Sequence, residues 1–173
     1  MEERLEGMKK SITGEREDTA LYDWDFYAWT QSAAEDLRQG QLSEEDAQHV
    51  AEEVADMGKR DRRELRSRMT VLIMHLMKWA AQPKLRNKST WKATIIEQRD
   101  QINDLLADSP SLRVPLIQDL PHLYSRAALR AADETGLNLT VFMRPAAFTG
   151  KVAHIDHLLA DLWCPETIDD LFN

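Results

Sequence analysis

An apolar segment enclosed by basic residues is the feature of this sequence that most restricts its fold. Residues 69–79 read MTVLIMHLMKW, which places apolar side chains on every face of a helix. Such a helix is stable only when neighbouring elements cover it on all sides, so it belongs at the centre of a helical protein. We therefore predict a buried central helix over about residues 60–81. Pro83 is expected to end it, because proline lacks a backbone N–H.

The basic charge of the chain is concentrated around this same segment. Residues 59–92 hold eleven of the 22 Lys and Arg residues and only two acids, which gives them a net charge of +9. The whole chain has a net charge of −8, so the rest of it carries −17. Its isoelectric point near 5.1 does not favour general nucleic-acid binding, which usually requires a basic domain. A local anion site in the basic segment is still compatible with an acidic protein.

Helical signals continue on the N-terminal side of the central segment. Asp23 is expected to cap a first helix, which Gly40 ends. Ser43 and the acids after it resemble a capping box and predict the start of a second helix. Gly58 is expected either to end that helix or to form a weak joint before the central one.

Helical signals also continue on the C-terminal side. Ser89 is expected to cap a helix that runs to about Leu105, and Ser109 to cap another that ends before Gly136. Pro115 and Pro121 should interrupt or kink this last helix. A short helix over residues 151–162 and a final turn over residues 165–171 complete the chain. Since no segment alternates as a strand does, we predict an all-α, single-domain bundle of six to seven helices.

The composition also limits where the chain can function. It has no run of about 18 apolar residues, so we expect no membrane span. The N-terminus has no apolar region of the kind that secretory signals need. Cys164 is the single cysteine, which fits a reducing compartment. We therefore expect a cytoplasmic protein.

Five phrases of the sequence resemble one known family. They are, in order, LYDWDFYAWT, AEEVADMGKRDRREL, SRMTVLIMHLMKWAAQP, STWKATIIEQR and DSPSLR. The chain is similar to the bacterial domain of unknown function family 29 from about Leu21 to Leu137. The resemblance implies an almost entirely helical, uncharacterised protein. It divides the chain into an N-terminal extension (1–20), a helical core (21–137) and a C-terminal extension (138–173) packed on that core.

Arg68 and His75 form the first candidate site. On one helix they lie about 20° apart in rotation and about 10.5 Å apart along the axis, so both could reach one phosphate. The spacing resembles the Arg–His signature of HEPN ribonucleases, in which histidine transfers the proton and arginine holds the phosphate. The alternative is a core histidine that is hydrogen-bonded inside an apolar helix, and we favour this alternative.

Two further groups could hold a metal ion. Glu53 with Asp56, and Glu97 with Asp100, are carboxylate pairs of the kind that binds magnesium in all-α nucleotide pyrophosphohydrolases. His154 and His157, three residues apart, could share a metal with Cys164, but a zinc site needs three or four ligands. Solvated helix faces explain both groups more simply, so we expect no metal and no cofactor.

The loop after the central helix provides the last candidates. Lys84, Arg86, Lys88 and Lys92 could bind an anion, with Trp79 and Trp91 as stacking platforms, although core positions are favoured for both tryptophans.

These observations favour a non-catalytic protein–protein interaction module that forms a homo-oligomer, such as a homodimer, or binds another protein. Two alternatives stay open: a metal-independent HEPN-like ribonuclease that uses Arg68 and His75, and a nucleotide- or RNA-binding module that uses residues 59–92.

Overall fold

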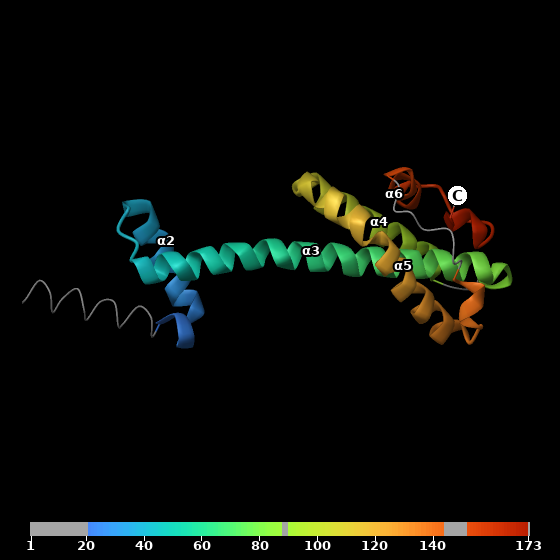
Figure 1. Ribbon diagram of the computed structural model, residues 1–173, viewed down its shortest axis with the longest axis horizontal. Helices are drawn as coiled ribbons and strands as arrows, with labels where there is room; N and C mark the ends of the chain where they lie inside the picture. Colours follow the sequence, from blue (N-terminus) through green and yellow to red (C-terminus); the bar gives the residue numbers. More distant parts are fainter. Residues whose placement is uncertain (1–20, 88–89, 144–151, 173) are drawn as a thin grey trace, which may run out of the picture. The chain divides into compact units, whose positions relative to one another are not determined.

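The structure is a computed structural model that describes residues 21–87, 90–143 and 152–172, without the side chains of residues 152–154 and 172. Helices make up 83% of the described residues, and none of these residues lies in a strand. The all-α fold predicted from the sequence is therefore confirmed (Figure 1). The chain divides into two compact units, Met1–Lys59 and Arg60–Asn173, which we call the N-terminal unit and the C-terminal unit and describe separately.

Helix α2 (Phe26–Gln39) of the N-terminal unit is capped by a side chain at its start and by a glycine at its end. Asp25 accepts a hydrogen bond from the backbone N–H of Ala28 at 3.0 Å, so it is the N-cap in place of the predicted Asp23. Asp23 itself lies within helical residues 21–24. Gly40 ends α2 as predicted, with a left-handed φ of 68° that favours glycine.

Helix α3 (Glu44–Ala81) extends over 38 residues. At its start the Ser43 hydroxyl accepts a hydrogen bond from the backbone N–H of Asp46 at 3.0 Å and donates one to the Asp46 carboxylate at 2.6 Å, which confirms the predicted cap. Of the two alternatives expected at Gly58, an end of the helix is excluded, because α3 continues through this residue. A glycine inside a helix costs only about 0.5–1 kcal/mol, which the helix-forming residues on either side offset. The predicted central helix is thus the C-terminal part of a longer one.

The C-terminal unit forms its core around this part of α3. Helices α4 (Trp91–Asp108), α5 (Arg113–Thr135) and α6 (Val152–Leu159) lie around it (Figure 1). All three contribute apolar side chains to the core. Short 3-10 turns precede or follow these helices at Pro83–Leu85, Pro110–Leu112, Leu139–Val141 and Asp169–Phe172. The helical spacing of apolar residues predicts six side chains to be among the least exposed, and five of them are completely buried: Leu72, Ile73, Leu76, Ile95 and Ile102. The sixth, Trp79, is half-buried.

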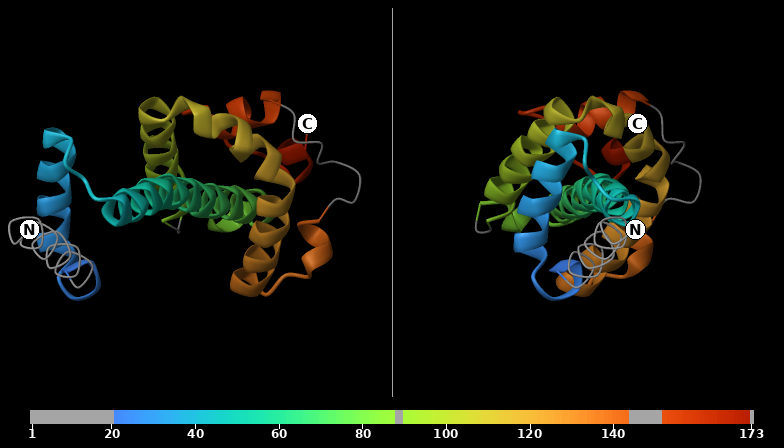
Figure 2. Two further views of the ribbon diagram at one scale, coloured as in Figure 1. Left: turned by 60° about the vertical axis from the view of Figure 1, so that its left-hand side comes forward. Right: turned by 90° about the vertical axis from the view of Figure 1, so that its left-hand side faces the viewer.

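Helix α5 contains both prolines that were predicted to interrupt or kink it. Neither interrupts it: Pro115 lies in the first turn, where an N–H has no partner within the helix. Pro121 lies inside the helix, whose axis bends along its length (Figure 2). A bend is what the clash of a proline ring with the preceding turn produces. The neighbouring Leu120 and Leu123 are completely buried, and this packing helps to maintain the helix.

Arg99 of α4 connects the C-terminal residues to the core. Its guanidinium group is almost completely buried and donates to the carbonyl oxygens of Leu158, Asp161 and Trp163 at 2.8, 3.2 and 2.6 Å. These carbonyls follow the end of α6 or lie in its last turn, where no helical N–H is available to them. A single buried cation therefore fixes the path of the chain after α6.

Candidate anion-binding site

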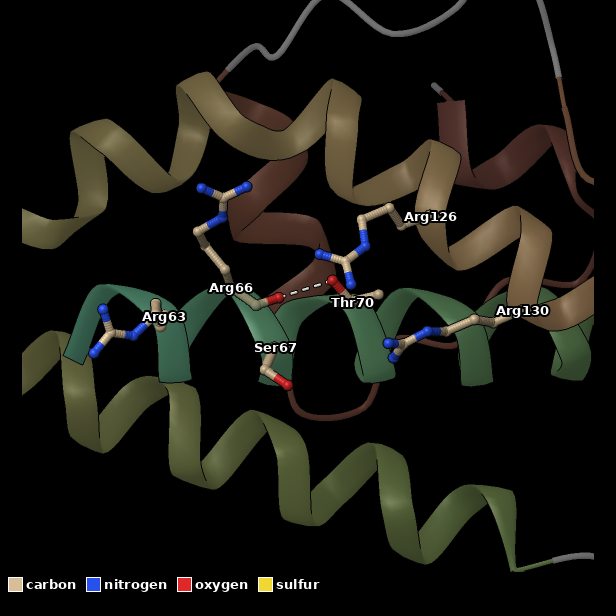
Figure 3. Close-up of a pocket in the computed structure, with 6 residues that line it drawn as sticks. All are labelled: Arg63, Arg66, Ser67, Thr70, Arg126 and Arg130. Atoms are coloured by element: carbon tan, nitrogen blue, oxygen red, sulfur yellow. Dashed lines mark hydrogen bonds between the residues drawn. The ribbon is translucent and has the colours of Figure 1, made fainter. Parts of the chain in front are cut away.

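A pocket of about 250 Å³ lies on the surface of the C-terminal unit (Figure 3). Its lining consists of polar side chains that donate hydrogen bonds: Arg63, Arg66, Ser67, Thr70, Arg126 and Arg130. We call this the arginine pocket.

Two helices provide the arginine pocket. Arg63, Arg66 and Thr70 are three and four residues apart on α3, and Arg126 and Arg130 are four apart on α5. Residues with this spacing lie on one face of a helix. In Figure 3 the two α5 side chains extend toward α3. The pocket is therefore built on two regular elements, which hold the lining more firmly than a loop would.

Alanines of α5 and apolar residues of α3 fix the two faces in place. Three alanines lie next to the pocket arginines in the sequence of α5 and are buried in the core: Ala127, Ala128 and Ala131. On α3, Leu65 and Met69 are buried beside the pocket residues. Small buried residues let a helix approach its neighbour closely, so the arginines emerge at the edge of the contact instead of far out in solvent.

The arginine pocket has a strong excess of positive charge. Four guanidinium groups line it, and no acid does. Asp119 compensates part of this charge, since it pairs with Arg62 at 3.0 Å and with Arg66 at 3.5 Å. Within the described ranges, no ion pair involves Arg63, Arg126 or Arg130. Like charges that are held together repel one another, so an anion bound among them would stabilise the arrangement.

The chemistry of the lining favours binding over catalysis. Arginine donates hydrogen bonds and does not release its proton near neutral pH. The Thr70 hydroxyl donates to the carbonyl of Arg66 at 2.8 Å, and Ser67 is exposed. No histidine or carboxylate among the described residues lines the pocket, so these side chains provide no general base.

The structure places Arg68 and His75 on α3 but gives each a separate partner. The Arg68 Nε and Nη2 atoms donate to one carboxylate oxygen of Glu64 at 2.9 and 2.7 Å. His75 is half-buried, and its Nδ1 lies 2.9 Å from the Val71 carbonyl, so Nδ1 carries the proton. Burial lowers the pKa of His75, and the nearby Lys78 lowers it further. Each side chain thus binds a residue one turn toward the N-terminus, and they do not converge here; the ribonuclease hypothesis stays a prediction.

The predicted anion-binding residues after α3 are dispersed. Lys84 and Lys92 are exposed, and Lys88 lies outside the described residues. Arg86 donates to the carbonyls of Trp79 at 2.9 Å and Glu166 at 2.8 Å, and its guanidinium lies 5.3 Å from the Trp79 ring centroid. Arg86 is therefore engaged with the protein's own backbone, a role that the sequence did not indicate.

The metal-binding candidates also have other contacts or lie outside the description. His157 is exposed and stacks on Trp163 at 5.2 Å, and the side chain of His154 lies outside the described residues. Glu53 accepts a hydrogen bond from Tyr22, and Asp56 pairs with Lys59. Within the described part of the chain, no three histidine, cysteine or acidic side chains are grouped so that they could hold a metal ion.

Sequence reasoning missed half of the arginine pocket. Arg63 and Arg66 lie within the basic segment 59–92, but Arg126 and Arg130 lie far outside it. The available signal was the four-residue spacing of Arg126 and Arg130 in a helix whose intervening residues include alanines. That spacing predicts a shared helix face, but it does not say which other helix the face meets.

The fold and the pocket define an all-helical protein with an arginine-lined surface site. The chain matches the family described as "Domain of unknown function DUF29" over residues 21–163, and it belongs to this family. The match continues past Leu137, where the resemblance in sequence phrases ended. No similar protein was found among curated proteins or among solved structures. Within the described ranges, no helix is both long enough and apolar enough to cross a bilayer.

Proposed function

We propose that this chain is a non-catalytic binding protein whose arginine pocket holds a phosphate group of an anionic ligand. The observation that carries this proposal is the convergence of four arginines from two helices on a lining without an acid. The proposal refines the sequence-based hypothesis of a nucleotide- or RNA-binding module. That hypothesis used the basic segment 59–92, with anion-binding candidates after α3. The present proposal keeps Arg63 and Arg66 of this segment and adds Arg126 and Arg130 of α5.

Phosphate fits this lining better than a carboxylate does. The planar guanidinium group of arginine binds two oxygens at once, and one such contact already satisfies a carboxylate. A phosphate group presents three or four oxygens and up to two negative charges, so several arginines can share it. The exposed Ser67 hydroxyl in the same lining can donate a further hydrogen bond.

The proposal is tested by titrating the full chain with inorganic phosphate and with pyrophosphate in a calorimeter, at several salt concentrations. Arg126→Ala/Arg130→Ala removes two pocket charges. Lys84→Ala/Lys92→Ala is the matched control, since it removes the same charge from exposed positions that the sequence had suggested. We expect the pocket variant to lose affinity by about tenfold or more, because a hydrogen bond to a charged group contributes about 1.5–3 kcal/mol.

The control variant should lose affinity by about twofold or less, because Lys84 and Lys92 do not line the pocket and salt screens their exposed charges. Equal losses in the two variants would show that general charge, and not the pocket, attracts the anion. Absence of phosphate and pyrophosphate binding by the unmodified chain would refute the proposal. Binding of an RNA oligonucleotide that depends on Lys84 and Lys92 alone would support the module first inferred from the sequence.

The interaction with another protein or a second copy, which the sequence favours, stays a prediction. It is compatible with the arginine pocket, because a phosphate group can belong to a macromolecule. A cytoplasmic location and a homodimer stay predictions.

A further inference from the structure

The N-terminal unit leaves most of its large apolar side chains in contact with solvent. Among its described residues, only Trp29 and Ala33 are both apolar and buried. The exposed ones, with their exposed fractions, are Trp24 (77%), Phe26 (48%), Tyr27 (75%), Leu37 (57%), Val54 (62%) and Met57 (60%). An exposed apolar group of this size in so small a unit is typical of an interaction surface.

Some of these exposed side chains lie on the same faces of α2 and α3 as the residues through which the two helices contact each other within the unit. On α2, Phe26 and Leu37 lie within about 40° of the buried Ala33 around the helix axis. On α3, Met57 lies within about 40° of Asp46 and Glu53. These two acids bind the α2 side of the unit, since Trp29 donates to Asp46 and Tyr22 to Glu53, each at 2.9 Å. We call the exposed apolar side chains that lie on these faces, Phe26, Leu37 and Met57, the uncovered face.

Acidic residues outnumber basic ones in the segment that carries the uncovered face. Residues 21–59 contain ten acids and two bases, which gives a net charge of −8. Both bases are already paired: Arg38 with Glu35 at 3.2 Å and Lys59 with Asp56 at 2.7 Å. The acids that remain in excess make this unit attractive to a cation-rich partner.

We propose that the uncovered face binds a basic amphipathic helix of another protein. The apolar side of such a helix would cover Leu37 and Met57, and its Lys and Arg residues would lie against the acids around them. A second copy of residues 21–59 would bring another −8 to the same place, so like charges oppose self-association there. This inference rests on the N-terminal unit alone and is independent of the arginine pocket.

The probe for the test is a synthetic 18-residue helical peptide of leucine and lysine at amphipathic spacing, titrated against the full chain near physiological salt. A peptide with the same leucines and glutamate in place of lysine tests the charge requirement. Leu37→Ser/Met57→Ser tests the face. Val114→Ser/Leu129→Ser is the matched control, because these two side chains of α5 are exposed to a similar extent (62% and 57%).

The leucine–lysine peptide is expected to bind one to one, with at least a tenfold loss of affinity in Leu37→Ser/Met57→Ser and less than a twofold change in the control. Circular dichroism would verify that both variants keep their helix content. Equal binding of the glutamate peptide, equal losses in both variants, or absence of binding would overturn the proposal. Sedimentation that shows a dimer of the unmodified chain and a monomer of Leu37→Ser/Met57→Ser would also overturn it, because a second copy would then occupy the face.

Discussion

The arginines of the C-terminal unit differ in what their guanidinium groups contact. Arg99 and Arg86 donate to main-chain carbonyls and join distant parts of the chain. In the described residues, Arg126 and Arg130 have no ion pair and line a pocket instead. The sequence does not distinguish these roles, because the contacts of a long flexible side chain depend on which elements surround it.

Arg86→Ala tests one of the roles that the sequence did not indicate. As a surface charge, Arg86 would contribute about 0.5 kcal/mol or less to the free energy of unfolding. Arg86 also donates to the half-buried carbonyl of Trp79 and the exposed carbonyl of Glu166, and its guanidinium contacts the Trp79 ring. These contacts raise the expected loss in the free energy of unfolding to about 1–2 kcal/mol. Urea denaturation would measure it, with the exposed Lys84→Ala as the control. Equal midpoints for the two variants would contradict the structural role of Arg86.

His75 should make the stability of the protein depend on pH. Burial, followed by repulsion from Lys78, lowers its pKa in the folded protein below the ordinary value of 6.5, although the Val71 carbonyl and Glu134 oppose this. The unfolded chain therefore takes up the proton first as the pH falls through 6.5, and protonation favours unfolding. This contribution to stability is complete above neutral pH and is lost as the pH decreases toward the folded pKa.

Replacing the histidine isolates this effect. We expect His75→Gln to lose less stability than the unmodified protein between pH 7.5 and 5.5, because its side chain binds no proton in that range. Urea midpoints at several pH values would measure the difference. The same pH dependence in both proteins would show that His75 is not the group responsible.

At the scale of elements, the glycine signals predicted where helices end, whereas the cap signals at Asp23 and Ser109 did not: Asp25 caps α2, and α5 begins at Arg113 without a cap bond from Ser109. Gly40 and Gly136 end their helices as expected, with φ values of 68° and 69° that other residues rarely adopt. Gly58 and Pro115 carry signals of the same kind but interrupt nothing. The difference lies in the surrounding structure: a lone glycine or a first-turn proline costs less than the hydrogen bonds and packing of an uninterrupted helix.

Gly58→Ala tests the continuity of α3 directly. No atom lies within 4 Å of where an alanine Cβ would be, and the residue is inside the helix, so we expect a gain of about 0.5–1 kcal/mol in stability. At Gly40 the same change should destabilise, because the left-handed conformation strains alanine. Thermal or urea denaturation would compare the two. Destabilisation by Gly58→Ala would indicate a break in the helix at this position.

The elements also explain which part of the arginine pocket could be predicted. The charge of residues 59–92 predicted an anion site in this segment. Two of its residues on α3, Arg63 and Arg66, line the pocket. Their partners from α5 depend on how two helices pack, and spacing within one helix does not contain that information. For the same reason Arg99, four residues after Ile95 on α4, could not be recognised as a core residue: its burial depends on carbonyls provided by the chain after α6.

At the scale of the whole molecule, the two compact units differ in how much apolar surface they bury. The C-terminal unit has one continuous core, to which α3, α4, α5 and α6 all contribute. In the N-terminal unit, two buried apolar side chains and a few polar contacts are found among the residues that the structure describes. Because burial of apolar area is the main stabilising contribution, the two units should differ in local stability.

Hydrogen exchange along α3 is the measurement that reports this difference, since the helix contains residues of both units. Amides of residues 69–80, which include the completely buried Leu72, Ile73 and Leu76, should exchange only on extensive unfolding. Amides of residues 48–57 lie in a mostly exposed part of the helix and should exchange about tenfold faster or more, through local opening.

The leucine–lysine peptide should slow exchange in residues 48–57 and leave residues 69–80 unchanged, because a ligand protects the segment whose opening it prevents. Equal protection along the whole of α3 without the peptide would mean that the two units unfold as one, and that the small core of the N-terminal unit is stabilised by contacts other than those seen within it.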